Sequence, residues 1–409
     1  MDPTRVAAVV TTAWALGACR HTDAVEHDRP APSAPQVIVT GVASTEARAP
    51  FEQPPGVVID HGAASDKAYV GSPSIAVLPD GSYVASHDWF GPGTTKDRTE
   101  VFGSTDRGGH WSKLSEVDGQ WWSTLFVHDN RLYLIGTSKE FGAVVIRRSS
   151  DGGRSWTSPD SAASGRLTDQ DGYHCAPVPV VEHGGRLWRA VEHVHERKDV
   201  GSKFKVLVIS TATNADLLDR SSWTFATPVS GDAAWLGGDF ENWLEGNAVV
   251  SPSGDIVDVL RVNSKASQER VAVAHVSADG KTVVFDPTKD FVEFSGGSKK
   301  FTIRFDPQTK LYWTLADVIA KESEGGATDN IRNTLALQSS TDLQKWSQRK
   351  IVLHHDDRKK HAFQYVDWLF DGDDIIAVSR TAYDDATGGA HSFHDANYLT
   401  FHRIARFRD

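Results

Sequence analysis

The sequence has few cysteines: only Cys19 and Cys175 occur among its 409 residues. If processing consumes Cys19, no intrachain disulfide can form, and Cys175 is then expected to be a lone buried thiol. The sequence also has no Cys-x-x-Cys pair and no His pair at the spacing of metal ligands. It therefore supports no structural zinc site, and we expect the protein to use neither a metal ion nor another cofactor.

Positive charge is scarce as well. The chain has 43 Lys and Arg residues against 54 Asp and Glu residues, which gives a formal net charge of -11 at pH 7. A surface of this charge, without a basic stripe, repels the phosphate backbone, so we expect no nucleic-acid partner. A glycan, a polysaccharide or a small ligand suits the charge better. Apolar residues make up 39% of the chain, which is enough for a folded core.

The sequence contains no apolar run long enough to cross a bilayer. The longest candidate, residues 6–18, follows Arg5 and fits the core of a signal peptide. It ends in Leu16-Gly17-Ala18-Cys19, which resembles the lipobox of bacterial lipoproteins, whose cysteine receives lipid. We therefore expect residues 1–19 to be a lipoprotein-type signal peptide, with an ordinary secretion signal as the alternative. The resemblance implies export to the periplasm or cell surface, with Cys19 as the only membrane anchor.

The chain beyond residue 50 repeats one unit, in which an apolar strand, a tight turn and a second strand follow one another. In the first unit, residues 74–78 and 83–85 flank the turn Pro79-Asp80-Gly81. The six turns are 79–81, 128–130, 183–185, 252–254, 306–309 and 371–373. Glycines in most of them supply the positive φ that tight hairpins need. Six units, each large enough for four strands, predict an all-β fold, a six-bladed β-propeller of four-stranded antiparallel blades.

These repeats define the domain organisation. Residues 20–50 are rich in proline, small and charged residues, which predicts a disordered tether. The propeller is expected to cover residues 51–409. Its predicted blades are residues 71–115, 120–160, 173–228, 244–288, 298–350 and 361–408. The last blade shows only three strands, so we expect residues 56–60 to supply its outer strand and close the ring.

A second repeat supports the propeller. Residues 104–111 and 149–156 share the pattern Ser-x-Asp-x-Gly-x-x-Trp, and residues 340–346 carry a shortened copy. The pattern resembles the Asp-box of sialidases and related propellers. Its Asp can accept hydrogen bonds from its own turn, and its Trp can pack between blades. We therefore expect Asp106 and Asp151 to be structural.

Propeller geometry selects the candidate site residues. The first strand of each blade lies nearest the axis, and its start shares one face with the end of the second strand. Side chains suited to chemistry gather at these positions. Those at strand starts are His174, Glu245, Asn247, His361 and Tyr365. Those at or after strand ends are Asp88, Glu192, Arg261, Arg380, Tyr383 and His394, and Arg332 opens a third strand on the same face.

Sialidases resemble the chain over nearly all six blades. Glu245 and Arg261 match a Glu and an Arg of their fourth blade, and Arg332 matches an Arg of their fifth blade. Asp88 stands near the place of their acid/base Asp. Tyr365 stands near their tyrosine nucleophile, with a register about two residues off. The resemblance thus implies a catalytic set of Asp88, Glu245 and Tyr365.

One motif of that family is missing. Sialidases open their first blade with Arg-Ile-Pro, whose arginine helps to bind the substrate carboxylate, whereas this chain has Ser72-Pro73-Ser74-Ile75. A missing bidentate partner weakens carboxylate recognition. Arg380 is the candidate replacement. The expected substrate is therefore a terminal, acidic or unusual sugar rather than sialic acid itself.

Three functions remain open. The first is an exo-acting, sialidase-like glycoside hydrolase, in which Glu245 takes the proton of Tyr365, since an unaided phenol is a poor nucleophile. The expected substrate-binding residues are Arg261, Arg332, Arg380, His174, Glu192, Asn247, Tyr383 and His394. The second is a polysaccharide lyase acting on a uronate polymer through His174, His361, His394 and Tyr383. The third is a non-catalytic glycan-binding propeller with Trp121, Trp122 and Trp243 as stacking platforms.

Overall fold

The computed structural model describes residues 51–194, 204–265, 269–321 and 325–409. The predicted signal peptide, the lipid-anchor residue Cys19 and the predicted tether lie outside these ranges and stay predictions. Among the described residues, no helix is both long and apolar enough to span a membrane. Helical structure there is limited to 3₁₀ turns: η1 (Ala64–Asp66), η3 (Arg220–Ser222), η4 (Trp235–Gly238) and η6 (Thr328–Asn330).

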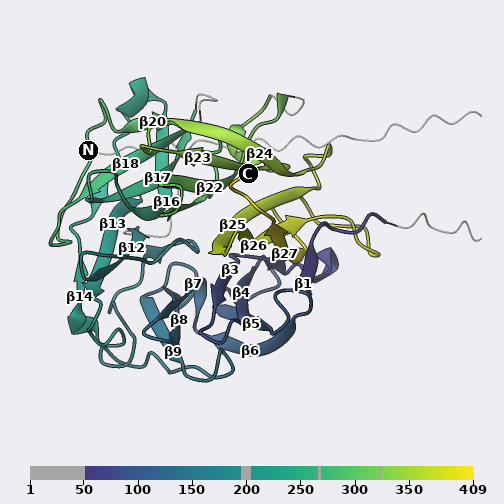
Figure 1. Ribbon diagram of the computed structural model, residues 1–409, viewed down its shortest axis with the longest axis horizontal. Helices are drawn as coiled ribbons and strands as arrows, with labels where there is room; N and C mark the ends of the chain where they lie inside the picture. Colours follow the sequence, from purple (N-terminus) through teal and green to yellow (C-terminus); the bar gives the residue numbers. More distant parts are fainter. Residues whose placement is uncertain (1–50, 195–203, 266–268, 322–324) are drawn as a thin grey trace, which may run out of the picture. The chain divides into compact units, whose positions relative to one another are not determined.

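Six antiparallel sheets surround a central axis, which confirms the predicted six-bladed propeller (Figure 1). The first three blades follow the chain in order. Blade one contains β2 (Tyr69–Val70), β3 (Ser74–Val77), β4 (Tyr83–Phe90), β5 (Arg98–Ser104) and β6 (Ser112–Asp118). Blade two contains β7 (Trp121–His128), β8 (Arg131–Thr137) and β9 (Val144–Ser149). Blade three contains β10 (Tyr173–His174), β11 (Val181–His183), β12 (Arg186–His193), β13 (Lys205–Ala212), β14 (Trp223–Phe225) and β15 (Val229–Ser230).

The other three blades complete the ring. Blade four contains β16 (Phe240–Val250), β17 (Ile256–Ser264), β18 (Arg270–Val276), β19 (Val283–Val284) and β20 (Phe291–Glu293). Blade five contains β21 (Thr302–Asp306), β22 (Leu311–Asp317), β23 (Thr334–Ser340) and β24 (Trp346–His354). Blade six contains β25 (Ala362–Asp371), β26 (Asp374–Ala382), β27 (Tyr398–Ile404) and β1 (Val57–His61).

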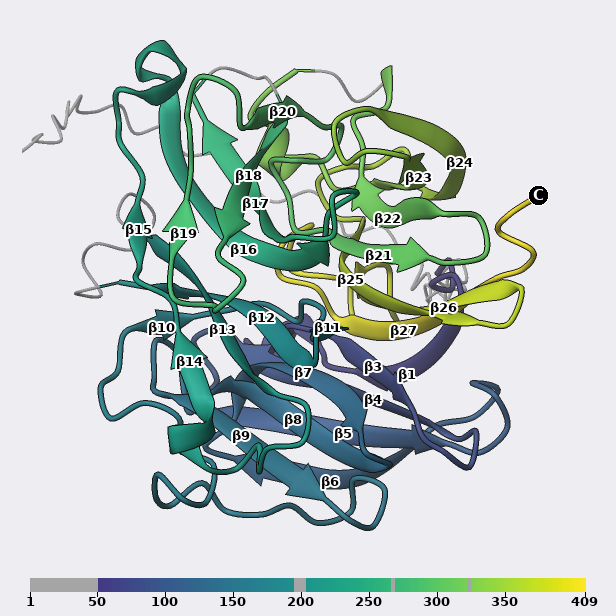
Figure 2. The same cartoon turned by 60° about the vertical axis from the view of Figure 1, so that its left-hand side comes forward.

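The ring closes as the sequence predicts. Strand β1 pairs with β27, with Val57 opposite Phe401 and His61 opposite Tyr398, so a strand that precedes blade one becomes the outer strand of blade six. Figure 2 shows β1 in purple beside the yellow strands of that blade. Pairing the two ends of the domain removes an open sheet edge.

The outer position of blade two differs from a regular strand. Residues 165–167 run beside β9: Ile146 N–H donates to Gly165 O (2.8 Å) and Leu167 N–H to Val144 O (2.9 Å). Only one bridge, between Val145 and Arg166, forms there. The blade therefore extends beyond its predicted end at residue 160, because its outer segment returns after a loop.

The turns with the Ser-x-Asp-x-Gly-x-x-Trp pattern are stabilised by their aspartates. Asp151 Oδ1 accepts hydrogen bonds from the N–H groups of Arg154 (3.1 Å) and Ser155 (2.9 Å). Asp106 Oδ1 likewise accepts one from His110 N–H (2.9 Å). Trp111 packs on Phe401 of blade six, with ring centroids 5.5 Å apart. The aspartates thus have turn partners, and neither belongs to the residues that line the central cavity described below.

Replacing Asp151 by Ala is expected to lower the free energy of unfolding by about 1–2 kcal/mol, since its turn loses several hydrogen bonds at an exposed position. Thermal denaturation measures this loss, and the Michaelis constant should stay the same. Asp160→Ala is the control, because Asp160 accepts one bond, from Ser158 Oγ. An Asp151→Ala protein that is fully stable but inactive would contradict the structural role.

Candidate active site

A cavity of about 190 Å³ lies where the inner strands begin and the second strands end. Blades one, two, three, four and six contribute to its wall. The lining residues are Gly71, Ser72, Asp88, Phe90, Lys96, Trp121, Trp122, Glu140, His174, Cys175, Glu245, Tyr365, Arg380 and His394. The cavity thus gathers the three predicted catalytic residues, Asp88, Glu245 and Tyr365, from three different blades.

Tyr365 and Glu245 are in direct contact. The Tyr365 hydroxyl donates to Glu245 Oε1 (2.9 Å), and the other oxygen of Glu245 accepts from Arg261 Nη1 (2.9 Å). Glu245 is only 2% exposed. Burial alone would raise the pKa of Glu245, but the Arg261 guanidinium and His174 hold that pKa below its ordinary value. The carboxylate is therefore ionised and placed to accept the phenol proton.

Three β-bulges shape the cavity. Trp122, Glu245 and Tyr365 all have positive φ, at 49°, 56° and 57°. Each lies at a register shift in the innermost strand of its blade, in β7, β16 and β25. Positive φ strains a residue with a side chain, at about 1–3 kcal/mol each, and a bulge re-aims the side chains around it. The bulge in β25 brings Tyr365 to Glu245, although Tyr365 lies about two residues away in the sequence from the place where sialidases have their nucleophile.

Two further arginines flank the Tyr365 ring. The guanidinium carbon of Arg380 lies 4.9 Å from the ring centroid, and that of Arg332 lies 5.7 Å away. Arg332 donates to Gln364 Oε1 (2.6 Å) and to a backbone carbonyl, and Arg380 donates to the carbonyl of His394. Both are about 95% buried, and no ion pair to a carboxylate is found for either among the described residues. Arg380 lines the cavity, so its positive charge is available to an anion there, whereas Arg332 lies beside the same ring but outside the cavity lining.

Asp88 lies across the cavity in blade one. Its carboxylate accepts backbone N–H bonds from Ser72 (2.8 Å) and Trp122 (2.7 Å). Burial raises the pKa of Asp88 to about 6, although these two bonds act in the opposite direction. Gly71 lies against the same carboxylate, since a Cβ there would come 1.6 Å from Asp88 Oδ1. Asp88 is thus fixed in place and can hold a proton in mildly acidic solution.

Glu192 orients the ring of His174. Its Nδ1 lies 2.7 Å from Glu192 Oε2, and Glu192 Oε1 accepts from the N–H of Gly246 (3.1 Å). The ring packs edge-on against Trp122, with centroids 4.4 Å apart. Glu192 therefore positions His174 and the bulge at Glu245 together, and it is not itself among the residues that line the cavity.

Other predicted site residues lie elsewhere. Asn247 is fully buried between blades four and five, where its Oδ1 accepts from Ile303 N–H (3.0 Å). The hydroxyl of Tyr383 donates to Glu52 (2.7 Å), and its ring packs against His361. None of these side chains lines the cavity. Of the proposed stacking platforms, Trp121 and Trp122 line the cavity, whereas Trp243 is fully buried in the core.

Several cavity residues were not predicted. Phe90 and Lys96 follow Asp88 in blade one, and Lys96 pairs with Glu140 of blade two (2.8 Å). The alternation of side chains along β4 places Phe90 on the same side as Asp88, so the sequence held a signal for Phe90. Cys175 was expected to be an isolated buried thiol, and it is a free, buried cysteine at the cavity wall.

No protein-family profile and no curated protein matches the sequence, but solved structures match the fold. The Hadza microbial sialidase Hz136 is 13% identical with a TM-score of 0.56, over 86% of this chain and 68% of that one. An α-L-arabinanase from Penicillium chrysogenum, complexed with arabinobiose, is 14% identical with a TM-score of 0.51, over 87% and 98%. Trypanosoma rangeli sialidase is 15% identical with a TM-score of 0.54, over 86% and 58%. The chain therefore has the six-bladed propeller fold of sialidases and arabinanases.

Proposed function

We propose that the chain is an exo-acting, retaining glycoside hydrolase with Tyr365 as its nucleophile. The contact between the Tyr365 hydroxyl and the buried, ionised Glu245 (2.9 Å) carries this proposal. Glu245 takes the phenol proton as the phenolate oxygen bonds to the anomeric carbon. Asp88 gives its proton to the leaving glycosidic oxygen. In the second step Asp88 takes a proton from water, the water oxygen displaces Tyr365, and Glu245 returns the phenol proton.

The arginines support an acidic terminal sugar as the substrate. A buried charge without an oppositely charged partner is costly, so Arg332 and Arg380 favour an anionic group beside Tyr365. A neutral phenol as nucleophile also avoids bringing a carboxylate against an anionic sugar. The cavity of about 190 Å³ has the size of a single sugar ring, which fits attack at a chain end.

An assay with aryl glycosides of acidic and neutral sugars tests the proposed function. Nuclear magnetic resonance of the first-formed product should show the anomeric configuration of the substrate, and a fluorinated, slowly released glycoside should label Tyr365. An ultraviolet-absorbing unsaturated product would instead indicate a lyase, with His174 as the base nearest the cavity. Binding without turnover would indicate a glycan-binding propeller.

Replacing Arg380 by Lys is expected to raise KM for an acidic glycoside by about 10–100-fold, because lysine keeps the charge but loses the planar fork. The kcat/KM for a neutral aryl glycoside should change by less than about threefold. Arg154→Lys, in an Asp-box turn, is the control. An equal fall of kcat/KM on both glycosides would refute a role of Arg380 in recognising the acidic group.

A further inference from the structure

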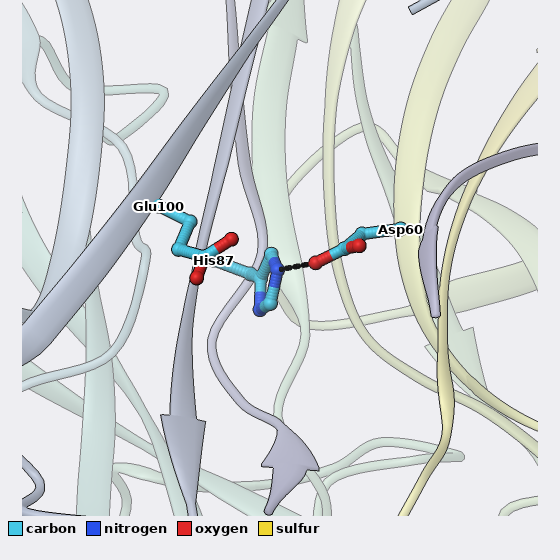
Figure 3. A group of neighbouring side chains, drawn as sticks. All are labelled: Asp60, His87 and Glu100. Atoms are coloured by element: carbon cyan, nitrogen blue, oxygen red, sulfur yellow. Dashed lines mark hydrogen bonds and ion pairs between the residues drawn. The ribbon is translucent and has the colours of Figure 1, made fainter. Parts of the chain in front are cut away.

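Three side chains with metal-ligand chemistry meet at the seam between blades six and one. Asp60 belongs to β1, His87 to β4 and Glu100 to β5. One ligand atom from each lies within 4.8 Å of the other two. Figure 3 shows the His87 ring with the Asp60 and Glu100 carboxylates on either side of it. These residues are far apart in the sequence, which is why spacing patterns did not predict them.

The hydrogen bonds of His87 require a proton or a metal ion between its Nε2 and the carboxylate of Asp60. Its Nδ1 lies 2.9 Å from the backbone carbonyl of Asp88, which can only accept, so Nδ1 carries a hydrogen. Its Nε2 lies 2.9 Å from Asp60 Oδ2. The ring is fully buried, and Glu100 is its partner across the β4–β5 ladder. Either a proton on Nε2 or a cation bound to Nε2 satisfies this arrangement.

We propose that Asp60, His87 and Glu100 bind a divalent metal ion, with zinc as the ion to test first. A proton would need only Asp60, whereas here a second carboxylate, that of Glu100, also has an oxygen within 4.8 Å of the His87 and Asp60 ligand atoms. The bond from Nδ1–H to a carbonyl is the arrangement that orients metal-binding histidines through their other nitrogen. One imidazole and two carboxylates form a three-ligand set that suits zinc, with water completing the coordination.

The cluster borders a cavity on the side of Glu100. This cavity of about 430 Å³ is lined by Glu100 together with His61 and Trp89, whereas Asp60 and His87 are not among its lining residues. Lys113 lies 3.0 Å from Glu100 Oε2 and also contacts Glu116. Since Lys113 is 41% exposed, it can keep its bond to one oxygen of Glu100, or move away, while the other oxygen binds the ion.

Binding here would join the strand that closes the ring to the strand that carries Asp88. The ion would link β1 of blade six to β4 and β5 of blade one. Through the Nδ1 bond it would also fix the carbonyl of Asp88. The proposal concerns binding and stability, so it does not depend on the proposed hydrolase activity.

Calorimetry of the chelator-treated full chain with zinc chloride tests the proposal. We expect saturable binding of one ion and, with free zinc at about 100 times Kd, a rise in melting temperature of about 5 °C. Glu100→Gln should weaken zinc binding by about 10–100-fold, as should Asp60→Asn. Cobalt bound in place of zinc should give a visible absorption band that both substitutions remove.

Glu116→Gln is the matched control, because Glu116 contacts the same lysine on the same blade but lies outside the cluster. It should bind zinc as the unchanged chain does. If the chain binds no zinc, or if Glu100→Gln binds it as tightly as Glu116→Gln does, the cluster is a protonated histidine paired with Asp60 and the proposal is wrong. Because Glu100 has no direct bond to His87 in that alternative, Glu100→Gln remains informative even if Asp60→Asn fails to fold.

Discussion

The Tyr365→Phe protein is expected to lose turnover by more than about 10⁴-fold, because it keeps the ring but has no oxygen to bond to the anomeric carbon. Glu245→Gln should lose about 10²–10⁴-fold in kcat, since the amide cannot accept the phenol proton. Both proteins should still bind the substrate, because Arg332 and Arg380 are unchanged. Steady-state kinetics on the best aryl glycoside, with calorimetry of a product sugar, measures the two effects separately.

Tyr383→Phe provides the control. It removes the same kind of Tyr–Glu hydrogen bond, here to Glu52 (2.7 Å), but outside the cavity. Its kcat should stay within about threefold. If Tyr383→Phe is the inactive protein and Tyr365→Phe is active, the nucleophile is misassigned. The lyase interpretation based on His174 and Tyr383 would then take first place.

The propeller could be predicted because its signals are local and repeated. Each hairpin carries its own turn residues, and the Asp of each Ser-x-Asp-x-Gly-x-x-Trp repeat bonds to its own turn. Both patterns can therefore be recognised without knowledge of the rest of the fold. The closing strand β1 followed from counting strands in the last blade. The shared face followed from the alternation of strand starts and ends, and it included Asp88, Glu245 and Tyr365. The resemblance to sialidases then singled out these three as the catalytic set.

The exact positions of the side chains depended on features that hairpin patterns do not encode. The bulges at Trp122, Glu245 and Tyr365 add residues to strands that otherwise read as regular. Asn247 was placed on the functional face, but its amide is used between two blades. Tyr383 was expected to bind the substrate, but its hydroxyl donates to Glu52, a residue from the beginning of the domain.

Contacts of charged side chains could likewise be predicted within one blade but not between distant blades. Arg261 and Glu245 could be paired from one blade, because their strands are neighbours in the chain. Arg380 of blade six could only be offered as a candidate replacement for the missing first-blade arginine, and its contact with Tyr365 was not predicted. Its place against both Phe90 (4.3 Å) and Tyr365 (4.9 Å) results from contacts between blades one and six. Pairing between distant blades is set by the closed ring and not by any local pattern.

The pH dependence of the proposed activity is expected to follow Asp88. Since burial raises the pKa of Asp88 to about 6, the carboxyl is protonated below that pH and ionised above it. Proton donation to the leaving oxygen requires the protonated form. For a glycan with an alcohol leaving group, kcat/KM should therefore fall as the pH rises through about 6. An aryl glycoside with an acidic phenol needs no proton, so its kcat/KM should lack this decline.

Asp88→Asn should accordingly lower kcat/KM on the glycan by about 10²–10⁴-fold and on the activated aryl glycoside by less than about tenfold. The comparison uses kcat/KM because this constant reports only the steps up to the departure of the leaving group, so the later role of Asp88 as a base does not enter it. The amide keeps the volume of the carboxyl but cannot give up a proton. A folded Asp88→Asn protein that loses equally on both substrates, or that keeps the decline near pH 6, would show that another group donates the proton. His174, a titratable side chain that the buried carboxylate of Glu192 orients at the cavity wall, would then be the acid to test.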